Sequence, residues 1–166
     1  YVRRGGQWLI DRVVEEPVMP PPPSHYEQLK GLEWMIGDWT ERGESFQLEV
    51  TCNWTSKNNF ISRKFKLYRE DGTVDSGLQL IGWDASREEI RSWLFDSDGG
   101  FVSGRWDLKD GRWVVASVAT LADGSSGSFT SVFSPIDDSS YRWKKINRVL
   151  DGRLLPNIDP VTVHRN

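Results

Sequence analysis

Residues 32–44 read LEWMIGDWTERGE and join two kinds of local structure. The first half has the character of a short helical turn, and the second half, from Trp39, reads as a charged strand. Gly37 stands between them. Glycine has no Cβ and adopts backbone conformations that other residues avoid, so it permits a sharp change of direction here. The stretch therefore predicts a short helical segment that leads directly into the first strand of a sheet.

The helical segment itself is expected to be short. Leu29, Leu32 and Ile36 recur at helical spacing. Ser24 followed by Glu27 three residues later has the spacing of a capping box, which predicts that the helix starts with Ser24 as its N-cap. We therefore expect one or two helical turns, which are too few to cover an open sheet.

After Trp39 the chain is punctuated by signals for tight turns. The Asp-Gly pairs at 71–72, 110–111 and 151–152 supply the positive φ that hairpin turns require. Runs rich in Val, Ile, Phe, Trp and Thr lie between the turns. Residues 46–54, FQLEVTCNW, alternate apolar and polar side chains as a strand with one buried face does. We count about ten strands joined by short turns, which predicts an antiparallel meander.

Closure of this meander into a barrel is the favoured arrangement. An open sheet leaves edge strands exposed, and closure removes them. We therefore predict an all-β fold, a closed antiparallel meander barrel of about ten strands with a short N-terminal helical plug. A barrel of this size is wide enough to hold one small ligand. An open two-sheet sandwich is the alternative.

The composition excludes several classes of partner and site. The chain has 166 residues, enough for one domain with its own core, and nine tryptophans that bring large buried area at little rotamer cost. A net charge of −3 gives no general attraction to nucleic acid. No apolar run approaches the roughly 20 residues that span a bilayer, so no membrane is expected. Cys52 is the only cysteine, which excludes an internal disulfide and a multi-cysteine metal site. No targeting signal is visible, so the localisation stays open between the cytoplasm and export.

The N-terminal residues have an organisation of their own. Residues 1–16, YVRRGGQWLIDRVVEE, read as two strands around a Gly-Gly turn, and four consecutive prolines at 20–23 favour a stiff, extended linker. We interpret 1–16 as the end of a preceding domain, 17–24 as a linker and 25–166 as the barrel domain. The alternative is that 1–16 forms an additional strand of the barrel domain. Strands that lack their own sheet can add to the edge of a neighbouring chain, which would produce a homodimer through residues 1–16.

The Gly-x-Trp triplet of residues 37–39, after a short helical turn, resembles the calycin pattern shared by lipocalins, fatty-acid-binding proteins and nitrobindins. The resemblance implies that the helix plugs one end of the barrel and that Trp39 packs over the floor against an arginine from a late strand. We assign Gly37, Trp39 and Arg148 to closing the barrel, with Arg165 as the other candidate for the stacking arginine.

The nitrobindin resemblance also implies a possible cofactor. Nitrobindins bind haem through a histidine on the last strand, and VTVHRN places His164 similarly. Haem ligated by His164 is therefore an alternative, and no other cofactor or metal is expected.

Residues 1–16 also resemble the closing hairpin of a SnoaL-like domain, the fold of ketosteroid isomerases and polyketide cyclases. The main body, through phrases such as LEWMIGDW and GRLLPNIDPVTV, is similar to a domain that follows SnoaL-like domains in some bacterial proteins. This resemblance implies an accessory barrel of an isomerase or cyclase whose active site lies in the preceding domain.

No motif in this chain indicates catalysis. The sequence has no nucleophile elbow, HExxH zinc motif or phosphate-binding loop. The two histidines, His25 and His164, lie near the linker and the C-terminus, where neither is well placed to organise a catalytic triad. We therefore expect no catalytic residue here and predict a non-catalytic binding module.

The strand interiors carry the prediction of a ligand site. A largely apolar lining with one or two arginines or a glutamine suits a small apolar or amphipathic ligand, including one that bears a carboxylate. We predict that its lining residues are Arg63, Phe65, Leu80, Arg91, Trp93 and Phe95. The alternative is a fully packed interior, and a shift of one residue in register would exchange the two faces. The basic run at 142–148, RWKKINR, is interpreted as part of the solvated outer face.

Overall fold

The computed structural model describes residues 2–9, 24–43 and 45–166. The first described segment is a hairpin of β1 (Val2–Arg4) and β2 (Gln7–Leu9), which pair antiparallel around Gly5 and Gly6. Both glycines have positive φ, at 59° and 86°, as the sequence predicts for this turn. The expected continuation of this hairpin to residue 16 and the proline-rich linker at 17–23 lie outside the described residues.

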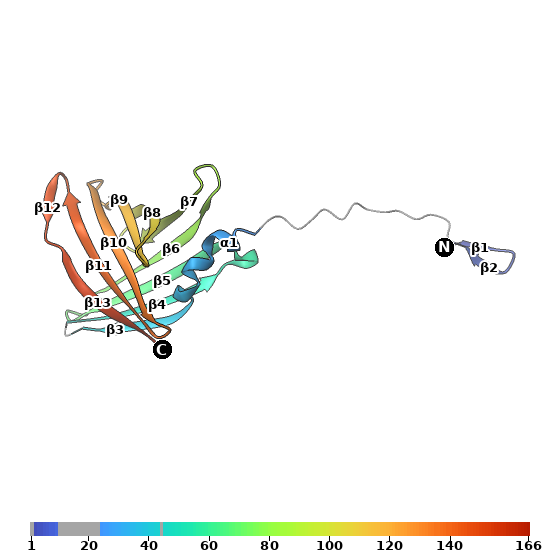
Figure 1. Ribbon diagram of the computed structural model, residues 1–166, viewed down its shortest axis with the longest axis horizontal. Helices are drawn as coiled ribbons and strands as arrows, with labels where there is room; N and C mark the ends of the chain where they lie inside the picture. Colours follow the sequence, from blue (N-terminus) through green and yellow to red (C-terminus); the bar gives the residue numbers. More distant parts are fainter. Residues whose placement is uncertain (1, 10–23, 44) are drawn as a thin grey trace.

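The main body is a closed barrel of ten antiparallel strands (Figure 1). Each strand pairs with its sequence neighbour, and the last strand returns to pair with the first through His164↔Thr40 and Arg165↔Trp39. A short additional strand, β12, pairs only with β11. The predicted meander barrel is confirmed, and the sandwich alternative is wrong. The strands are β3 (Gly37–Arg42), β4 (Phe46–Trp54), β5 (Phe60–Arg69), β6 (Val74–Asp84), β7 (Glu89–Asp96), β8 (Phe101–Lys109), β9 (Arg112–Thr120), β10 (Ser126–Asp137), β11 (Ser140–Leu150), β12 (Arg153–Leu155) and β13 (Ile158–Arg165).

A short helical plug precedes the barrel, as predicted. It consists of α1 (Tyr26–Leu29) and the 3-10 helix η1 (Lys30–Met35), and a second 3-10 turn, η2 (Ser56–Asn58), connects β4 to β5. The helix begins one residue later than the capping box indicates, because His25 rather than Ser24 is the N-cap. The Ser24 hydroxyl accepts the Tyr26 N–H at 3.2 Å and donates to the Lys57 carbonyl at 2.8 Å, so it ties the plug to the β4–β5 turn. No helix in the described part of the chain is long and apolar enough to cross a membrane.

Trp39 closes the end of the barrel next to the plug. Its side chain is only 1% exposed, and its Nε1 donates to the Met35 carbonyl at 2.8 Å. The guanidinium of Arg165 lies 4.1 Å from the centre of the Trp39 ring and donates to the carbonyls of Ile36 and Trp34. The plug, the first strand and the last strand are therefore joined at one point.

The stacking arginine is Arg165 and not Arg148. β13 pairs with the start of β3 at its own C-terminal end, and this register places Arg165 opposite Trp39. Arg148 lies in the part of β11 that pairs with β12, and its Nη1 donates to the Pro156 carbonyl at 2.8 Å. Arg148 therefore does not stack on Trp39, and the predicted alternative, Arg165, does.

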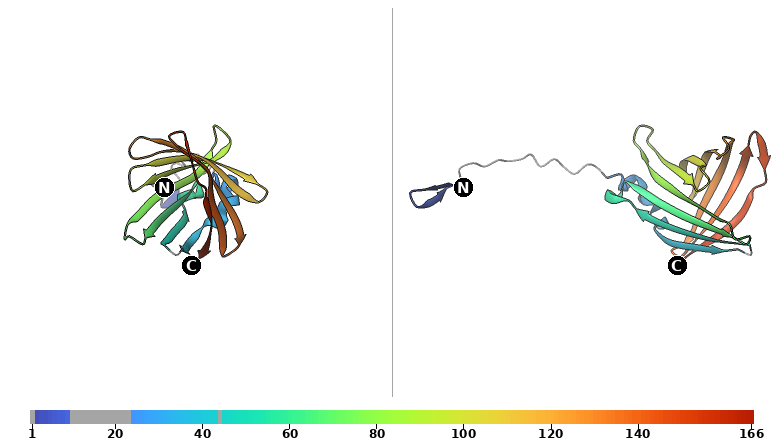
Figure 2. Two further views of the ribbon diagram at one scale, coloured as in Figure 1. Left: turned by 90° about the vertical axis from the view of Figure 1, so that its left-hand side faces the viewer. Right: turned by 180° about the vertical axis from the view of Figure 1, so that it is seen from behind.

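The interior divides into a packed part and a hollow part. The packed part lies next to the plug and includes the stacked rings of Trp106 and Phe133, whose centroids are 5.3 Å apart. The buried side chains of the packed part include Leu29, Leu32, Met35, Trp39, Ile61, Ile81, Trp106, Trp113, Phe133 and Tyr141. Figure 2 shows the barrel from two further sides. The two predicted alternatives, a hollow interior and a packed one, therefore each hold for one part of the barrel.

Candidate ligand-binding site

A cavity of about 880 Å³ occupies the barrel interior away from the plug. Its lining includes Ser45 in the β3–β4 turn and Glu70 and Asp71 in the β5–β6 turn. The plug is fixed to the β4–β5 turn, at the other ends of β4 and β5, so the cavity opens at the end opposite to the plug. Its volume lies in the range of roughly 300–1,000 Å³ that is typical of small-molecule pockets.

The walls of the cavity are mostly apolar. They come from alternate residues of β4, β5, β7, β11 and β13, because successive side chains of a strand point to opposite faces. Every second residue of β4 and β5 faces inward, and their register pairs Val50 with Phe65 and Leu48 with Leu67. The apolar lining side chains are Phe46, Leu48, Phe65, Leu67, Leu94, Trp143, Ile158, Val161 and Val163.

Three cations line this space: Arg69, which pairs with Asp75, and Arg63 and Lys145. No carboxylate of the described residues lies within ion-pairing distance of Arg63 or Lys145. The guanidinium of Arg63 lies 5.9 Å from the Phe133 ring centre, and the Lys145 amine lies 4.1 Å from the Phe129 ring centre. Aromatic faces offset part of the cost of burying a charge, but they do not replace an anionic partner.

A pair of unsatisfied polar atoms lies beside the cavity. Gln79 on β6 is directly opposite Arg63 on β5, and its side chain is 9% exposed. The Nε of Arg63 and the Oε1 of Gln79 are both buried and have no hydrogen-bond partner among the described residues. One is a donor and the other an acceptor, so each lacks a complementary polar partner.

Burial and neighbouring charges change the ionisation of the groups around these cations. Burial lowers the pKa of the Lys145 amine to about 8, and the positive charges of Arg148 and Arg63 add to this effect. Burial raises the pKa of the Tyr141 hydroxyl, and the charge of Arg63 opposes that rise. Burial also raises the pKa of the Cys52 thiol, which is opposite Arg63 in the register. Tyr141 and Cys52 therefore stay neutral at pH 7, and the charged groups of the lining are Arg63, Arg69, Glu70, Asp71 and Lys145.

The predicted ligand-binding residues divide between the two faces of the barrel. Arg63 and Phe65 line the cavity, as predicted. Leu80, Arg91, Trp93 and Phe95 share one face, as the sequence suggests, but that face is the outer one. Trp93 is 36% exposed and Phe95 is 54% exposed.

The register of β6 and β7 explains why these four residues face outward. Gln79 and Ile81 are buried and pair with Leu94 and Ser92, so these residues face inward and their neighbours face outward. The sequence analysis missed Gln79, Leu94, Tyr141 and Lys145. The one signal in the sequence is the position of Gln79, a polar residue within the apolar run LQLIGW at 78–83.

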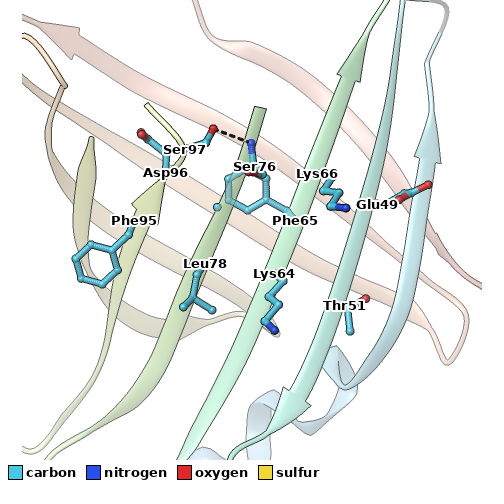
Figure 3. A pocket seen from close by; sticks show the side chains of 11 residues that line it. Glu49, Thr51, Lys64, Phe65, Lys66, Ser76, Leu78, Phe95, Asp96 and Ser97 are labelled. Carbon is cyan, nitrogen blue, oxygen red and sulfur yellow. Dashed lines mark hydrogen bonds between the residues drawn. The ribbon is translucent and has the colours of Figure 1, made fainter. Parts of the chain in front are cut away.

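The outer face carries a second hollow of about 610 Å³, over β4 to β7 (Figure 3). In this depression Lys64 lies beside Leu78, and Lys66 lies between Glu49 and Ser76. Both carboxylate oxygens of Glu49 are occupied, since they accept hydrogen bonds from Gln47 and Tyr68. The depression thus lacks the buried, unsatisfied groups that mark the interior cavity.

His164 lies on the outside of the barrel. Its side chain is exposed, and its neighbour Val163 is 1% exposed and faces inward. An imidazole in this position does not fit a haem held inside the barrel. Within the described ranges, no group of three or more His, Cys, Asp or Glu side chains is arranged to hold a metal ion.

No family model matches this chain, and no curated protein matches its sequence. The closed barrel of ten antiparallel strands is compatible with a calycin-like fold.

Replacing Lys145 with Met is expected to raise the free energy of unfolding at pH 7 by about 1–3 kcal/mol, because it removes a charge that the fold buries. The folded pKa of about 8 lies below the ordinary value of 10.5. Between these values the unfolded chain binds more protons, so the stability of the unmodified protein rises with pH in this window. The advantage of Lys145→Met should therefore shrink as the pH approaches 10.5.

Urea unfolding of both proteins at several pH values between 7 and 10.5 measures this difference. Lys144→Met is the matched control, because Lys144 is the adjacent residue and faces the other side of the strand. An equal response of the two variants at every pH would contradict the assignment of Lys145 to the interior.

Proposed function

We propose that the barrel binds one small amphipathic molecule, with an acidic head group between Arg63 and Lys145 and an apolar part along the inner walls. One observation carries this proposal: two half-buried cations, Arg63 and Lys145, face a mostly apolar cavity, and no carboxylate of the described residues pairs with them. Removing a charge from water without giving it a partner costs free energy. The anionic group of a ligand would supply the missing partner.

The unsatisfied atoms next to the cavity narrow the chemistry of the head group. The Nε of Arg63 needs an acceptor, which a carboxylate provides through a charge-assisted hydrogen bond. The Oε1 of Gln79 needs a donor, which a carboxylate lacks. A head group that combines an acid with a hydroxyl or an amide N–H would satisfy both atoms. The apolar walls then favour a hydrocarbon or aromatic body of the ligand.

The proposed role is binding without catalysis. The cavity lining contains no histidine, and the Cys52 thiol is kept protonated by burial, so we see no activated nucleophile paired with a general base. The relation to nitrobindins is part of the same proposal, and the floor formed by Gly37, Trp39 and Arg165 supports it. The hairpin of β1 and β2 supports the proposals that residues 1–16 end a SnoaL-like domain and can pair with a second chain.

Decanoate and 1-decanol are suitable probes, because they share a tail and differ in the charge of the head group. We expect decanoate to bind more tightly, and Arg63→Met to weaken decanoate binding by about 10–100-fold, which corresponds to the roughly 1.5–3 kcal/mol of a charge-assisted hydrogen bond. Decanol binding should change little. Isothermal titration calorimetry measures both affinities.

Arg91→Met is the matched control for this experiment. Arg91 is the same residue type, but it lies on the outer face, where it pairs with Glu89 at 3.0 Å. Its replacement should leave decanoate binding unchanged. If decanoate and decanol bind equally well, or if Arg91→Met weakens binding as much as Arg63→Met, the proposed head-group site is wrong.

A further inference from the structure

We propose that Lys145 captures carbonyl compounds, specifically aldehydes with an apolar chain, as a reversible imine inside the barrel. This inference rests on the proposed function in one respect: both use the same cavity. It does not depend on the acidic head-group site. It adds a covalent step to a site that is otherwise proposed to bind its ligand without bond formation.

Lys145 is half-buried in the cavity wall, and no carboxylate of the described residues lies within ion-pairing distance of its amine. The side chain lines the cavity, with the amine 4.1 Å from the Phe129 ring centre and 5.5 Å from the Trp143 ring centre. Its register partners on the neighbouring strands are Ser131 on β10 and Ile158 on β13, and neither carries a charge. An aldehyde with its chain along the apolar walls would therefore meet this amine and no competing ion pair.

The surroundings also favour the neutral, nucleophilic form of the amine. Enzymes that form Schiff bases activate lysine by desolvation in an apolar pocket or by a neighbouring cation. Both conditions apply to Lys145. Burial is the larger cause, and the positive charges of Arg148 and Arg63 add to it. Together they lower the pKa of the amine to about 8. The titratable and charged groups around the cavity are Arg63, Arg69, Glu70, Asp71, Tyr141 and, beyond its lining, Arg148.

The proposed step is a condensation and needs no oxidant or reductant. The nitrogen lone pair attacks the carbonyl carbon and forms a C–N bond, and one amine hydrogen is transferred to the carbonyl oxygen, which becomes a hydroxyl. Loss of this hydroxyl together with the one remaining amine hydrogen, as one water molecule, leaves the C=N bond. The reverse reaction, hydrolysis, releases the aldehyde, so capture is reversible.

Reductive trapping tests this step on the intact chain. The protein is incubated with decanal at pH 8 and reduced with sodium cyanoborohydride, and the added decyl group is located by peptide mass spectrometry. At this pH the neutral fraction is about half for Lys145 and below about 1% for an exposed lysine, so we expect about tenfold preference for Lys145 even though a weaker base is a weaker nucleophile. Labelling of Lys145 no faster than Lys144 would overturn the proposal.

Two controls connect the labelling to the cavity. Lys145→Arg keeps the charge but cannot form this imine, and it should lose the preferred label while Lys144→Arg retains it. If Lys145→Arg does not fold, competition between 1-decanol and decanal on the unmodified protein still tests the proposal. 1-Decanol should slow the labelling of Lys145 and leave the labelling of Lys144 unaffected. Equal slowing at both lysines, or at neither, would overturn the proposal.

The outcomes separate this inference from the proposed function. Decanoate binding that depends on Arg63, without preferential labelling of Lys145, overturns imine capture and leaves the proposed function intact. Preferential labelling of Lys145 without decanoate binding supports imine capture and overturns the acidic head-group site.

Discussion

Replacing Trp39 with Ala is expected to lower the free energy of unfolding by about 3–5 kcal/mol, which is the range for removing a fully buried aromatic side chain. Trp39 is 1% exposed and packs against the rings of Trp34 and Tyr141, at centroid distances of 6.5 and 5.0 Å. The substitution also leaves the Met35 carbonyl without its donor and removes the ring beneath Arg165. The loss therefore combines apolar area, a hydrogen bond and a cation–π contact.

Circular dichroism during urea unfolding measures this loss without relying on tryptophan fluorescence, which other tryptophans of the chain would dominate. Trp93→Ala is the matched control, because Trp93 is 36% exposed on the outer face. Its replacement should cost about 1 kcal/mol or less, as is usual for surface positions. Similar losses in both variants would show that Trp39 does not hold the floor together.

Replacing Gly37 with Ala is expected to cost about 2–4 kcal/mol, from two separate causes. The backbone of Gly37 has φ of 128°, a conformation that residues with a Cβ rarely adopt. A Cβ at this position would also collide with the guanidinium of Arg165. That group cannot move aside freely, because it donates to the carbonyls of Ile36, Trp34 and Asp138.

Two further variants separate these causes. Gly124 also has a positive φ, at 84°, but no atom lies within 4 Å of the position its Cβ would take. Gly124→Ala should therefore show the backbone cost alone, about 1 kcal/mol. If the collision contributes, Gly37→Ala should cost less in an Arg165→Ala background than in the unmodified protein. Additive losses would mean that Arg165 and Gly37 act independently.

The fold was predictable because its signals are local. Asp-Gly turns and alternating strands such as β4 determine a meander, and the lack of a long helix leaves closure as the way to remove exposed edges. The choice between Arg148 and Arg165 was not predictable in the same way. β11 pairs with both β12 and β13 and has a register shift between Trp143 and Lys145, and neither feature leaves a recognisable mark in the sequence.

The binding site was harder to predict because both faces of its strands carry apolar residues. On β6, Leu78 and Leu80 face outward while Gln79 and Ile81 face inward, so the usual rule of apolar inside and polar outside selects the wrong face. The basic run at 142–148 shows the same problem. It was interpreted as an outer face, yet Lys145 lies inside. Tertiary pairing with β10 and β13, and not local composition, decides between the adjacent Lys144 and Lys145.

The contacts that fix the plug lie at one end of the barrel, and the mouth of the proposed ligand cavity lies at the other. Substitutions around the mouth, near Ser45, Glu70 and Ile158, would leave the joint between Trp39 and Arg165 untouched. Such a layout lets natural variation or laboratory selection diversify what the chain recognises while its melting temperature stays nearly constant.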